Sequence, residues 1–347
     1  MPKVLSSLVP FAMALGVSAA SCELLPMPRG ISWDAGEFAM PGRDASCLTG
    51  VVSVVRDASV PAEGYRIDVT AAGVSIASSD DAGRFYAHGV VASLACADGR
   101  GKVTVPCCRI VDSPVFAWRG VLLDECRHFF GKTAVKEILD LMALHRLNVL
   151  HWHLTDADAW RLEIPGFPEL IEYGAVRPSG VAPDWTGGNK RHTNERYGPY
   201  FYTADDVREI LAYAAERQIS VVPEIEMPAH ARAALAAYPE FSCRGVALRP
   251  RIPHCTIGPQ YEIFCAGNEE AMVFLEKVLD YVCALFPSKV IGIGGDECPK
   301  NRWKECPKCQ ARVRALGLEN EEQLQNWMTH RFCGFLAKRG RRALAWD

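Results

Sequence analysis

From residue 114 onward, short apolar runs alternate with longer amphipathic segments. The apolar runs predict strands at 120–124, 148–153, 219–225, 290–293 and 343–346. The amphipathic segments, with an apolar face near the 3.6-residue helical period, predict helices at 133–145, 203–217, 269–286 and 321–340. Apolar strands that alternate with such helices are typical of a parallel sheet covered by helices.

Two of the predicted helices carry a capping signal. Thr133 precedes one amphipathic segment and is expected to be its N-cap. Thr203 and Asp206 have the spacing of a capping box, with Asp in place of Glu. We therefore expect helices to begin at these two points of the chain.

A parallel sheet of this kind closes either as an open, doubly wound sheet or as an eight-stranded barrel. A nucleotide-binding sheet has a Gly-rich loop after its first strand, whereas this chain has the polar segment 124–128 there. Polar residues also follow the other strands, and the pairs are Asp124 and Arg127, His153 and Asp156, Glu226 and His230, and Asp296 and Glu297. A ring of such strand-end groups is typical of a barrel active site.

The region before Pro114 has a different texture. Short alternating runs predict strands at 51–55, 65–69 and 73–76, and 85–94 predicts a helix behind them. We therefore assign residues 22–112 to a small α+β domain and residues 113–347 to the barrel. A complete barrel needs eight strand–helix units, and the chain supplies about five, so we expect it to be part of a longer enzyme.

The first residues have the pattern of a secretory signal. A basic Lys3, an apolar run and the small residues 18–21 precede Cys22. Cys22 after Ala-Ala-Ser also resembles a loose lipobox, which would make it a lipid anchor. We expect residues 1–21 to be a signal peptide of an exported bacterial protein, which is either secreted or a periplasmic or outer-membrane lipoprotein. A buried N-terminal helix is the alternative.

Composition excludes several classes of protein. Apolar residues make up 49% of the chain and charged residues 23%, as in a soluble globular protein with a core. The net charge of −3 indicates no nucleic-acid partner, and the basic segment 338–342 is expected to be a solvated face.

The chain has 14 cysteines. Three of them lie in one loop-like segment and could pair: Cys243, Cys255 and Cys265. Cys306 and Cys309 form one half of a zinc-ribbon pattern, with Cys298 and Cys333 as further candidate ligands. No second C-x-x-C follows at the ribbon spacing, so a structural pair or free buried thiols are favoured over zinc.

The strongest chemical signal is Gly294-Gly295-Asp296-Glu297. Two neighbouring carboxylates at a strand end do not both ionise easily, so one is expected to have a raised pKa and to act as a general acid. By itself the tetrapeptide could also be a turn with solvated acids.

Four ordered motifs carry a resemblance to a known family. They are Arg119-Gly120-Val121-Leu122-Leu123-Asp124-Glu125-Cys126-Arg127-His128, Asn148-Val149-Leu150-His151-Trp152-His153-Leu154-Thr155-Asp156, Pro223-Glu224-Ile225-Glu226-Met227-Pro228-Ala229-His230, and Gly294-Gly295-Asp296-Glu297. In order and spacing the segment 113–347 resembles the family 20 glycoside hydrolases, the β-N-acetylhexosaminidases. Gly83-Arg84-Phe85-Tyr86 and Asp112-Ser113-Pro114 resemble the small domain that often precedes this barrel.

The resemblance implies catalytic roles. Glu297 is expected to be the general acid/base, and Asp296 to orient the substrate's acetamido group. In this family that acetamido oxygen is the nucleophile, and the reaction retains configuration through an oxazolinium intermediate. A terminal GlcNAc or GalNAc of a glycan is the implied substrate, with no metal and no cofactor.

The resemblance also implies binding roles. Arg127 is expected to bind the 3- and 4-hydroxyls of the sugar, and Trp346 to form a wall of the acetamido pocket. Asp156 and His230 are expected to support the acid. Arg127 could instead be a surface ion-pair partner, and His230 a satisfied core histidine. His151 and His153 share a strand face and could bind a metal, while Trp152 and Trp160 are expected to pack in the core.

The chain departs from the family pattern at three alanines. Ala157 and Ala159 stand where the family commonly has Asp-Gln-Gly before the Trp, and Ala229 stands where it has Gly. An Ala at position 229 would be strained if the backbone there needed a positive φ. Later family strands also supply a Tyr, an acid and a Trp to the pocket. These departures and the missing strands make a non-catalytic or decayed glycan-binding homologue the main alternative. A metal-dependent amidohydrolase on a related barrel is a third hypothesis.

Overall fold

The computed structural model describes residues 24–41, 52–98, 100–181, 191–248 and 261–346. The predicted signal peptide with Cys22, and also Cys255, lie outside these described residues. The chain divides into two compact units. One unit comprises residues 1–121, 136–149 and 212–220, and the other comprises residues 122–135, 150–211 and 221–347.

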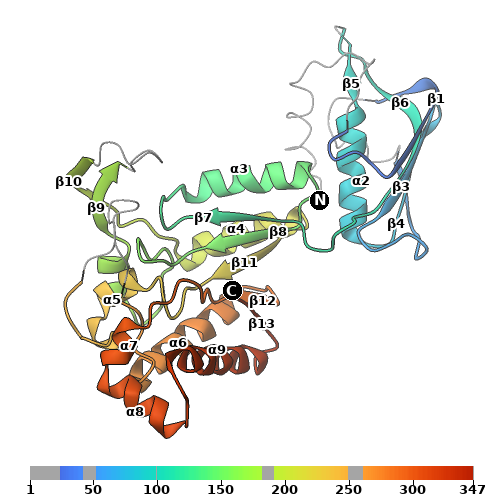
Figure 1. The fold of residues 1–347 in the computed structure, drawn as a ribbon. Coiled ribbons are helices and arrows are strands. Elements are labelled where there is room, and N and C mark those ends of the chain that lie inside the picture. Colours follow the sequence, from blue (N-terminus) through green and yellow to red (C-terminus); the bar gives the residue numbers. More distant parts are fainter. Residues whose placement is uncertain (1–23, 42–51, 99, 182–190, 249–260, 347) are drawn as a thin grey trace. The chain divides into compact units, whose positions relative to one another are not determined.

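The small N-terminal domain is a sheet with one helix on its face. The sheet order is β1 (Gly30–Ala39), β6 (Val103–Asp112), β3 (Tyr65–Thr70), β4 (Gly73–Ser78) and β2 (Val52–Arg56), with β5 (Cys96–Ala97) beside β6. Helix α2 (Asp81–Leu94) packs on β3, β4 and β6 (Figure 1). Ile67, Ile110 and Val91 are fully buried in the core. The three predicted strands and the helix are confirmed, and β1 and β6 complete the sheet.

Helix α2 begins earlier than predicted. The sequence predicts a start at Phe85, whereas the helix begins at Asp81. The carboxylate of Asp80 caps it, because Oδ1 accepts a hydrogen bond of 2.8 Å from the backbone N–H of Gly83.

The second sheet contains the five predicted strands. Its order is β13 (Arg342–Leu344), β12 (Val290–Gly292), β11 (Ser220–Glu224), β8 (Val149–His153) and β7 (Gly120–Asp124). Strand β12 pairs in parallel with both β11 and β13. The four predicted helices are α3 (Gly131–Leu144), α4 (Ala204–Glu216), α6 (Glu269–Leu285) and α9 (Glu321–Ala337). Helix α9 packs against α6 and β13 (Figure 1).

The two capping predictions have different outcomes. The capping box before α4 is confirmed: Oγ1 of Thr203 accepts a hydrogen bond from N of Asp206, and Oδ2 of Asp206 accepts one from N of Thr203, both at 3.2 Å. The prediction for Thr133 is wrong, because α3 begins at Gly131 and Thr133 lies in its first turn.

Several short elements connect the main ones and were not predicted. They are the π-helix η2 (Leu170–Gly174), the strand pair β9 (Arg177–Val181) and β10 (Arg191–Tyr197), α5 (Arg232–Ala237), the 3-10 helix η3 (Pro239–Phe241), α7 (Asn301–Glu305) and α8 (Pro307–Ala315). Trp152 and Trp160 are buried in the core, as predicted. None of the helices in the described ranges has the length and apolar composition to cross a membrane.

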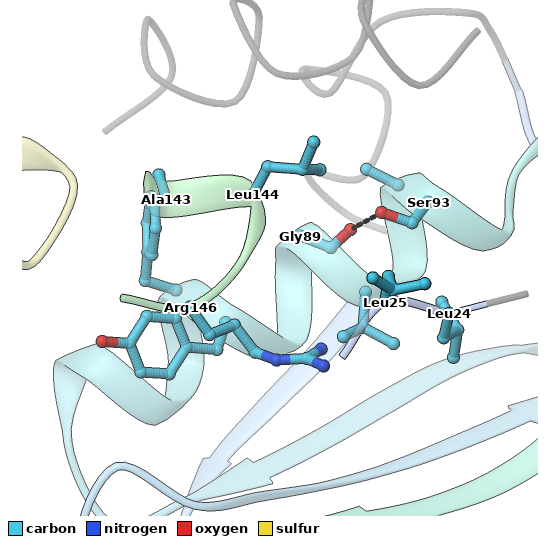
Figure 2. Close-up of a pocket in the computed structure, with 11 residues that line it drawn as sticks. Leu24, Leu25, Gly89, Ser93, Ala143, Leu144 and Arg146 are labelled. Carbon is cyan, nitrogen blue, oxygen red and sulfur yellow. Dashed lines mark hydrogen bonds between the residues drawn. The ribbon is translucent and has the colours of Figure 1, made fainter. Parts of the chain in front are cut away.

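Figure 2 shows a small pocket of the first unit. Gly89 and Ser93 of α2 line it together with Ala143 and Arg146. Inside it, Oγ of Ser93 donates a hydrogen bond of 2.9 Å to the carbonyl oxygen of Gly89. Its volume of about 20 Å³ accommodates a water-sized group and no sugar ring.

Candidate active site

His230 lies at the centre of a cluster of polar side chains from several strand ends. Its Nδ1 lies 3.4 Å from Oδ1 of Asp156, and its Nε2 lies 3.4 Å from Oε2 of Glu297. The same Nε2 lies 3.9 Å from Oδ2 of Asp296. One imidazole ring therefore bridges the segment after β8 and the segment after β12, so four of the predicted site residues lie together.

Arg127, three residues after Asp124 at the end of β7, joins the cluster through Asp156. Its Nη1 lies 2.8 Å from Oδ2 of Asp156, and its Nε lies 3.2 Å from Oδ2 of Asp158. Nη1 also donates to Oδ2 of Asp124 at 3.1 Å. Three carboxylates fix the guanidinium, and a third of the side chain stays exposed.

His151 and His153 both face the carboxylate of Glu224. Nδ1 of His153 lies 2.7 Å from Oε2 of Glu224, and Nε2 of His151 lies 2.9 Å from the same oxygen. The other ring nitrogen of His153 lies 3.1 Å from Oδ2 of Asp156. The shared strand face predicted for these histidines thus holds a buried carboxylate.

This pairing sets the charges of the buried carboxylates. Burial alone would raise the pKa of Glu224, but the ring nitrogens of His151 and His153 lower it to about 2. Burial likewise opposes the ionisation of Asp156, yet His153, His230 and Arg127 hold its pKa below the ordinary value. Both carboxylates are therefore charged at neutral pH.

The positive partner of this network is His230. Burial alone would lower its pKa, but the hydrogen bond to Asp156 and the charges around it raise the pKa to about 9. His230 is therefore protonated at neutral pH, and its positive charge lies between Asp156 and the Asp296–Glu297 pair.

Glu226 is the buried carboxyl whose pKa rises. Burial raises the pKa of Glu226 from 4.5 to about 8. Within the described part of the chain its Oε2 has no hydrogen-bond partner, and Gly294 packs against it. A Cβ built on Gly294 would lie 1.7 Å from this oxygen. Glu226 is therefore a neutral acid at pH 7, held in place by the glycine of the opposite loop.

Asp296 and Glu297 differ in exposure. The Asp296 side chain is 32% exposed, and the Glu297 side chain is 78% exposed. Glu297 has a φ of +44° and His230 a φ of +50°, so both residues adopt the left-handed conformation. The Glu297 carboxyl is thus open to solvent and lies beside His230.

The strain expected at Ala229 is absent. Among the described residues, Ala229 is not one of those with positive φ, and the left-handed conformation falls on the next residue, His230. A methyl group at position 229 therefore fits the backbone there, and the side chain is buried.

Trp346 forms the remaining part of the site. Its indole N–H donates a hydrogen bond of 2.7 Å to Oε1 of Glu224, and its ring stacks on His151 with a centroid distance of 5.7 Å. The side chain is half exposed. The N–H edge of the indole is thus bound to Glu224 and one face stacks on His151, while part of the ring remains exposed.

The sequence placed Glu226 in the ring of strand-end groups without a specific role, and it gave no role to Glu224 or Asp158. A signal for two of them was present: Glu224 and Glu226 are two residues apart at a strand end, so their side chains lie on the same face. The sequence does not show that Glu224 is ionised and Glu226 neutral, because these states follow from the histidines beside Glu224 and from the burial of Glu226.

Family models match almost the whole described chain. The model described as "Glycosyl hydrolase family 20, catalytic domain" matches residues 116–347. The model described as "Glycosyl hydrolase family 20, domain 2" matches residues 29–113.

Curated relatives and solved structures agree with these matches. A "Beta-hexosaminidase" of Porphyromonas gingivalis is 40% identical over 291 residues, which are 82% of this chain and 35% of that protein. A β-N-acetylhexosaminidase structure from Bacteroides fragilis has a TM-score of 0.80 and 33% identity, and the match covers 93% of this chain and 66% of that one. A family 20 exo-β-N-acetylglucosaminidase of Vibrio harveyi, solved with N-acetylglucosamine, has a TM-score of 0.81 and 28% identity, covering 95% and 56%.

These likenesses confirm the predicted fold class, a partial (β/α) barrel preceded by a small α+β domain. The chain spans about a third of the length of the Porphyromonas relative and 58% of a "Beta-hexosaminidase" of Akkermansia muciniphila.

Proposed function

Because the chain belongs to glycosyl hydrolase family 20, we propose that it removes terminal β-linked GlcNAc or GalNAc from glycans. The observation that carries this proposal is the position of His230, whose ring bridges Asp156 and the exposed carboxyl of Glu297. Such a site offers one carboxyl that can reach a glycosidic oxygen, beside a fixed positive charge. The names of the relatives, which include β-hexosaminidases and an exo-β-N-acetylglucosaminidase, support the same substrate class.

In the proposed reaction, Glu297 protonates the glycosidic oxygen and later takes a proton from water. Its exposed side chain is accessible to an incoming sugar. Asp296 orients the 2-acetamido group, whose carbonyl oxygen attacks the anomeric carbon and forms an oxazolinium ion. A single protein acid is sufficient because the nucleophile is held within the substrate. Water then opens the oxazolinium ring with a second inversion at the anomeric carbon, so the overall configuration is retained.

Binding of the sugar is assigned to Arg127 and Trp346. The planar guanidinium of Arg127 suits two adjacent hydroxyl groups, and its three carboxylate partners fix its orientation. The half-exposed indole of Trp346 provides an apolar wall for the acetamido methyl group. His230 and Asp156 are positioning residues, since they act through Glu297 and Arg127.

The direct test uses the p-nitrophenyl β-glycosides of GlcNAc and GalNAc. We expect p-nitrophenol release from at least one of them by the protein encoded by the complete reading frame. A folded protein that releases none contradicts the proposal. Saturable binding of the sugar without turnover would instead favour the non-catalytic glycan-binding alternative.

We also propose that the protein is exported. The basic start, apolar run and small residues before Cys22 support a cleaved signal, and the lipobox-like sequence supports lipid attachment at Cys22. Membrane fractionation of wild type and Cys22→Ser separates the two fates. A lipoprotein moves to the soluble fraction when Cys22 is replaced, a released protein is soluble in both forms, and a protein that keeps its N-terminal residues in the cytoplasm contradicts export.

A further inference from the structure

Four cysteines from three separate segments meet in the second unit. They are Cys243, Cys265, Cys306 and Cys309, and their sulfur atoms all lie within 4.8 Å of one another. Three of the Sγ–Sγ distances are 3.8 Å for Cys243 and Cys309, 3.7 Å for Cys265 and Cys306, and 3.6 Å for Cys265 and Cys309. The active-site residues described above are not part of this cluster.

These distances have the size expected for a metal tetrahedron. Zinc–thiolate bonds of about 2.3 Å in tetrahedral geometry place neighbouring sulfurs about 3.8 Å apart. A disulfide instead needs two sulfurs at about 2.0 Å. We propose that Cys243, Cys265, Cys306 and Cys309 bind one zinc ion as a closed tetrathiolate site.

The surroundings of the sulfurs suit thiolate ligands. Cys265, Cys306 and Cys309 are buried, so solvent has little access to a bound ion. Cys306 is the N-cap of α8, and Cys309 lies in the first turn of that helix. The positive end of the helix dipole favours the ionised form of a thiol at this position.

The backbone around the cluster is closely fitted. A Cβ at Gly267 would lie 2.2 Å from the carbonyl carbon of Lys308 and 2.3 Å from the backbone nitrogen of Cys309, so only a glycine allows this approach. The backbone N–H of Asn268 donates to the carbonyl oxygen of Cys265 at 2.9 Å, closing a tight turn after that ligand. The two segments thus hold their cysteines in a preformed arrangement.

The ligand set differs from the one that the sequence suggested. Cys298 and Cys333, which the sequence suggested as further ligands, are outside the cluster. Cys243 and Cys265 take their place, 66 and 44 residues before Cys309. No short motif links them to the pair, and only the fold brings them together.

Zinc binding is balanced in protons and charge. One Zn²⁺ replaces four thiol protons and leaves a site of charge −2, with no oxidation or reduction of sulfur. Since four protein ligands fill a tetrahedral site, no position remains for water or substrate, and the role is structural. This role differs from the metal-dependent hydrolysis considered from the sequence.

The site is connected to the loops of the proposed active site. Phe264, next to Cys265, donates its backbone N–H to the carbonyl oxygen of Pro228 at 3.0 Å, two residues before His230. The carbonyl oxygen of Phe264 accepts a hydrogen bond of 2.9 Å from the indole of Trp303, on α7 just before Cys306. Zinc would therefore hold the loop of His230 near the segment that follows Glu297.

The primary test measures zinc in the full chain purified without chelators, by mass spectrometry of the metal. We expect about one zinc per chain, and a loss on the order of tenfold or more in Cys309→Ser. Cys298→Ser is the matched control and should keep its zinc. Cys309→His preserves a zinc ligand and should also keep it, which separates loss of a ligand from loss of folding.

A second measurement is independent of zinc carried through purification. Cobalt added to the chelator-treated protein should give the charge-transfer and visible bands of tetrahedral cobalt thiolate in the Cys298→Ser control but not in Cys309→Ser. Three outcomes would each overturn the assignment. They are free alkylation of all four thiols, two disulfides among these cysteines in a non-reducing peptide map, and stoichiometric iron in place of zinc.

Discussion

The carboxylate of Glu226 lies directly against the α-carbon of Gly294. A Cβ at position 294 would lie 1.7 Å from Oε2 of Glu226, and Gly294 has a φ of +65°. Glu226 is almost fully buried, so its side chain has little room to move aside. This contact joins the end of β11 to the loop that carries Asp296 and Glu297.

Gly294→Ala should therefore destabilise the protein and distort the site. The left-handed backbone alone costs about 1 kcal/mol or more, and the overlap with Glu226 adds to it, so we expect a loss of more than about 2 kcal/mol in the free energy of unfolding. Urea denaturation measures this loss. Gly317→Ala is the matched control, because Gly317 has a φ of +64° and no atom within 4 Å of its Cβ position. Equal losses in the two variants would contradict a role for the contact with Glu226.

Glu226→Gln tests the neutral state of this carboxyl. Since folding raises the pKa of Glu226 from 4.5 to about 8, folding favours the protonated form. Its contribution to stability is complete below pH 4.5 and is lost as the pH rises through 8. Gln stays neutral at every pH. When the pH is raised from 5 to 8.5, the free energy of unfolding of the variant should therefore rise relative to that of wild type by a few kcal/mol, as an order of magnitude.

Denaturation at the two pH values measures this difference for Glu226→Gln. Glu305→Gln is the control, because the Glu305 side chain is 72% exposed. If the difference between Glu226→Gln and wild type were the same at both pH values, Glu226 would not be held as a neutral acid.

His230→Gln should show a pH dependence of its own. Folding raises the pKa of His230 from 6.5 to about 9, so its charge stabilises the folded protein fully below pH 6.5. This stabilisation is lost as the pH rises through 9. The variant should be clearly less stable than wild type at pH 6 and closer to it at pH 9.5. His330→Gln, on the exposed face of α9, serves as the control, and a pH-independent deficit in His230→Gln would argue against the charged imidazole.

Glu297→Gln should slow turnover strongly without unfolding the protein. General acid–base catalysis contributes about 10²–10⁴-fold, and we expect a loss of this size in kcat for p-nitrophenyl glycoside hydrolysis by the complete protein. The exposed side chain makes little contribution to stability, so the melting temperature should not change. Glu305→Gln should keep full activity, and wild-type turnover by Glu297→Gln would exclude Glu297 as the acid.

The sequence predicted the elements of the barrel well because its strands are apolar throughout. Strand β7 has the predicted bounds 120–124, and the polar residues after four strands lie at one site through His230. Parallel strands place their carboxyl ends at the same edge of a sheet, so periodicity alone was sufficient for this part.

Features set by distant contacts were beyond sequence reasoning. The high pKa of Glu226 depends on burial, and the cysteine cluster joins segments more than 40 residues apart. Strands β1 and β6 were missed, and their pairing joins residues more than 60 positions apart in the chain. Thr133 resembled a cap, but Gly131 with its φ of +82° begins the helix.

The backbone at Glu297 has a consequence for engineering. Glu297 holds a conformation that glycine or asparagine adopts more readily, and its side chain is mostly exposed, so such a substitution relieves local strain while removing the carboxyl proposed as the acid. His230 shares this backbone conformation, but its charge stabilises the folded protein, so its replacement brings no such gain. A selection for heat resistance that ignores turnover will therefore enrich changes at Glu297, where robustness and activity compete.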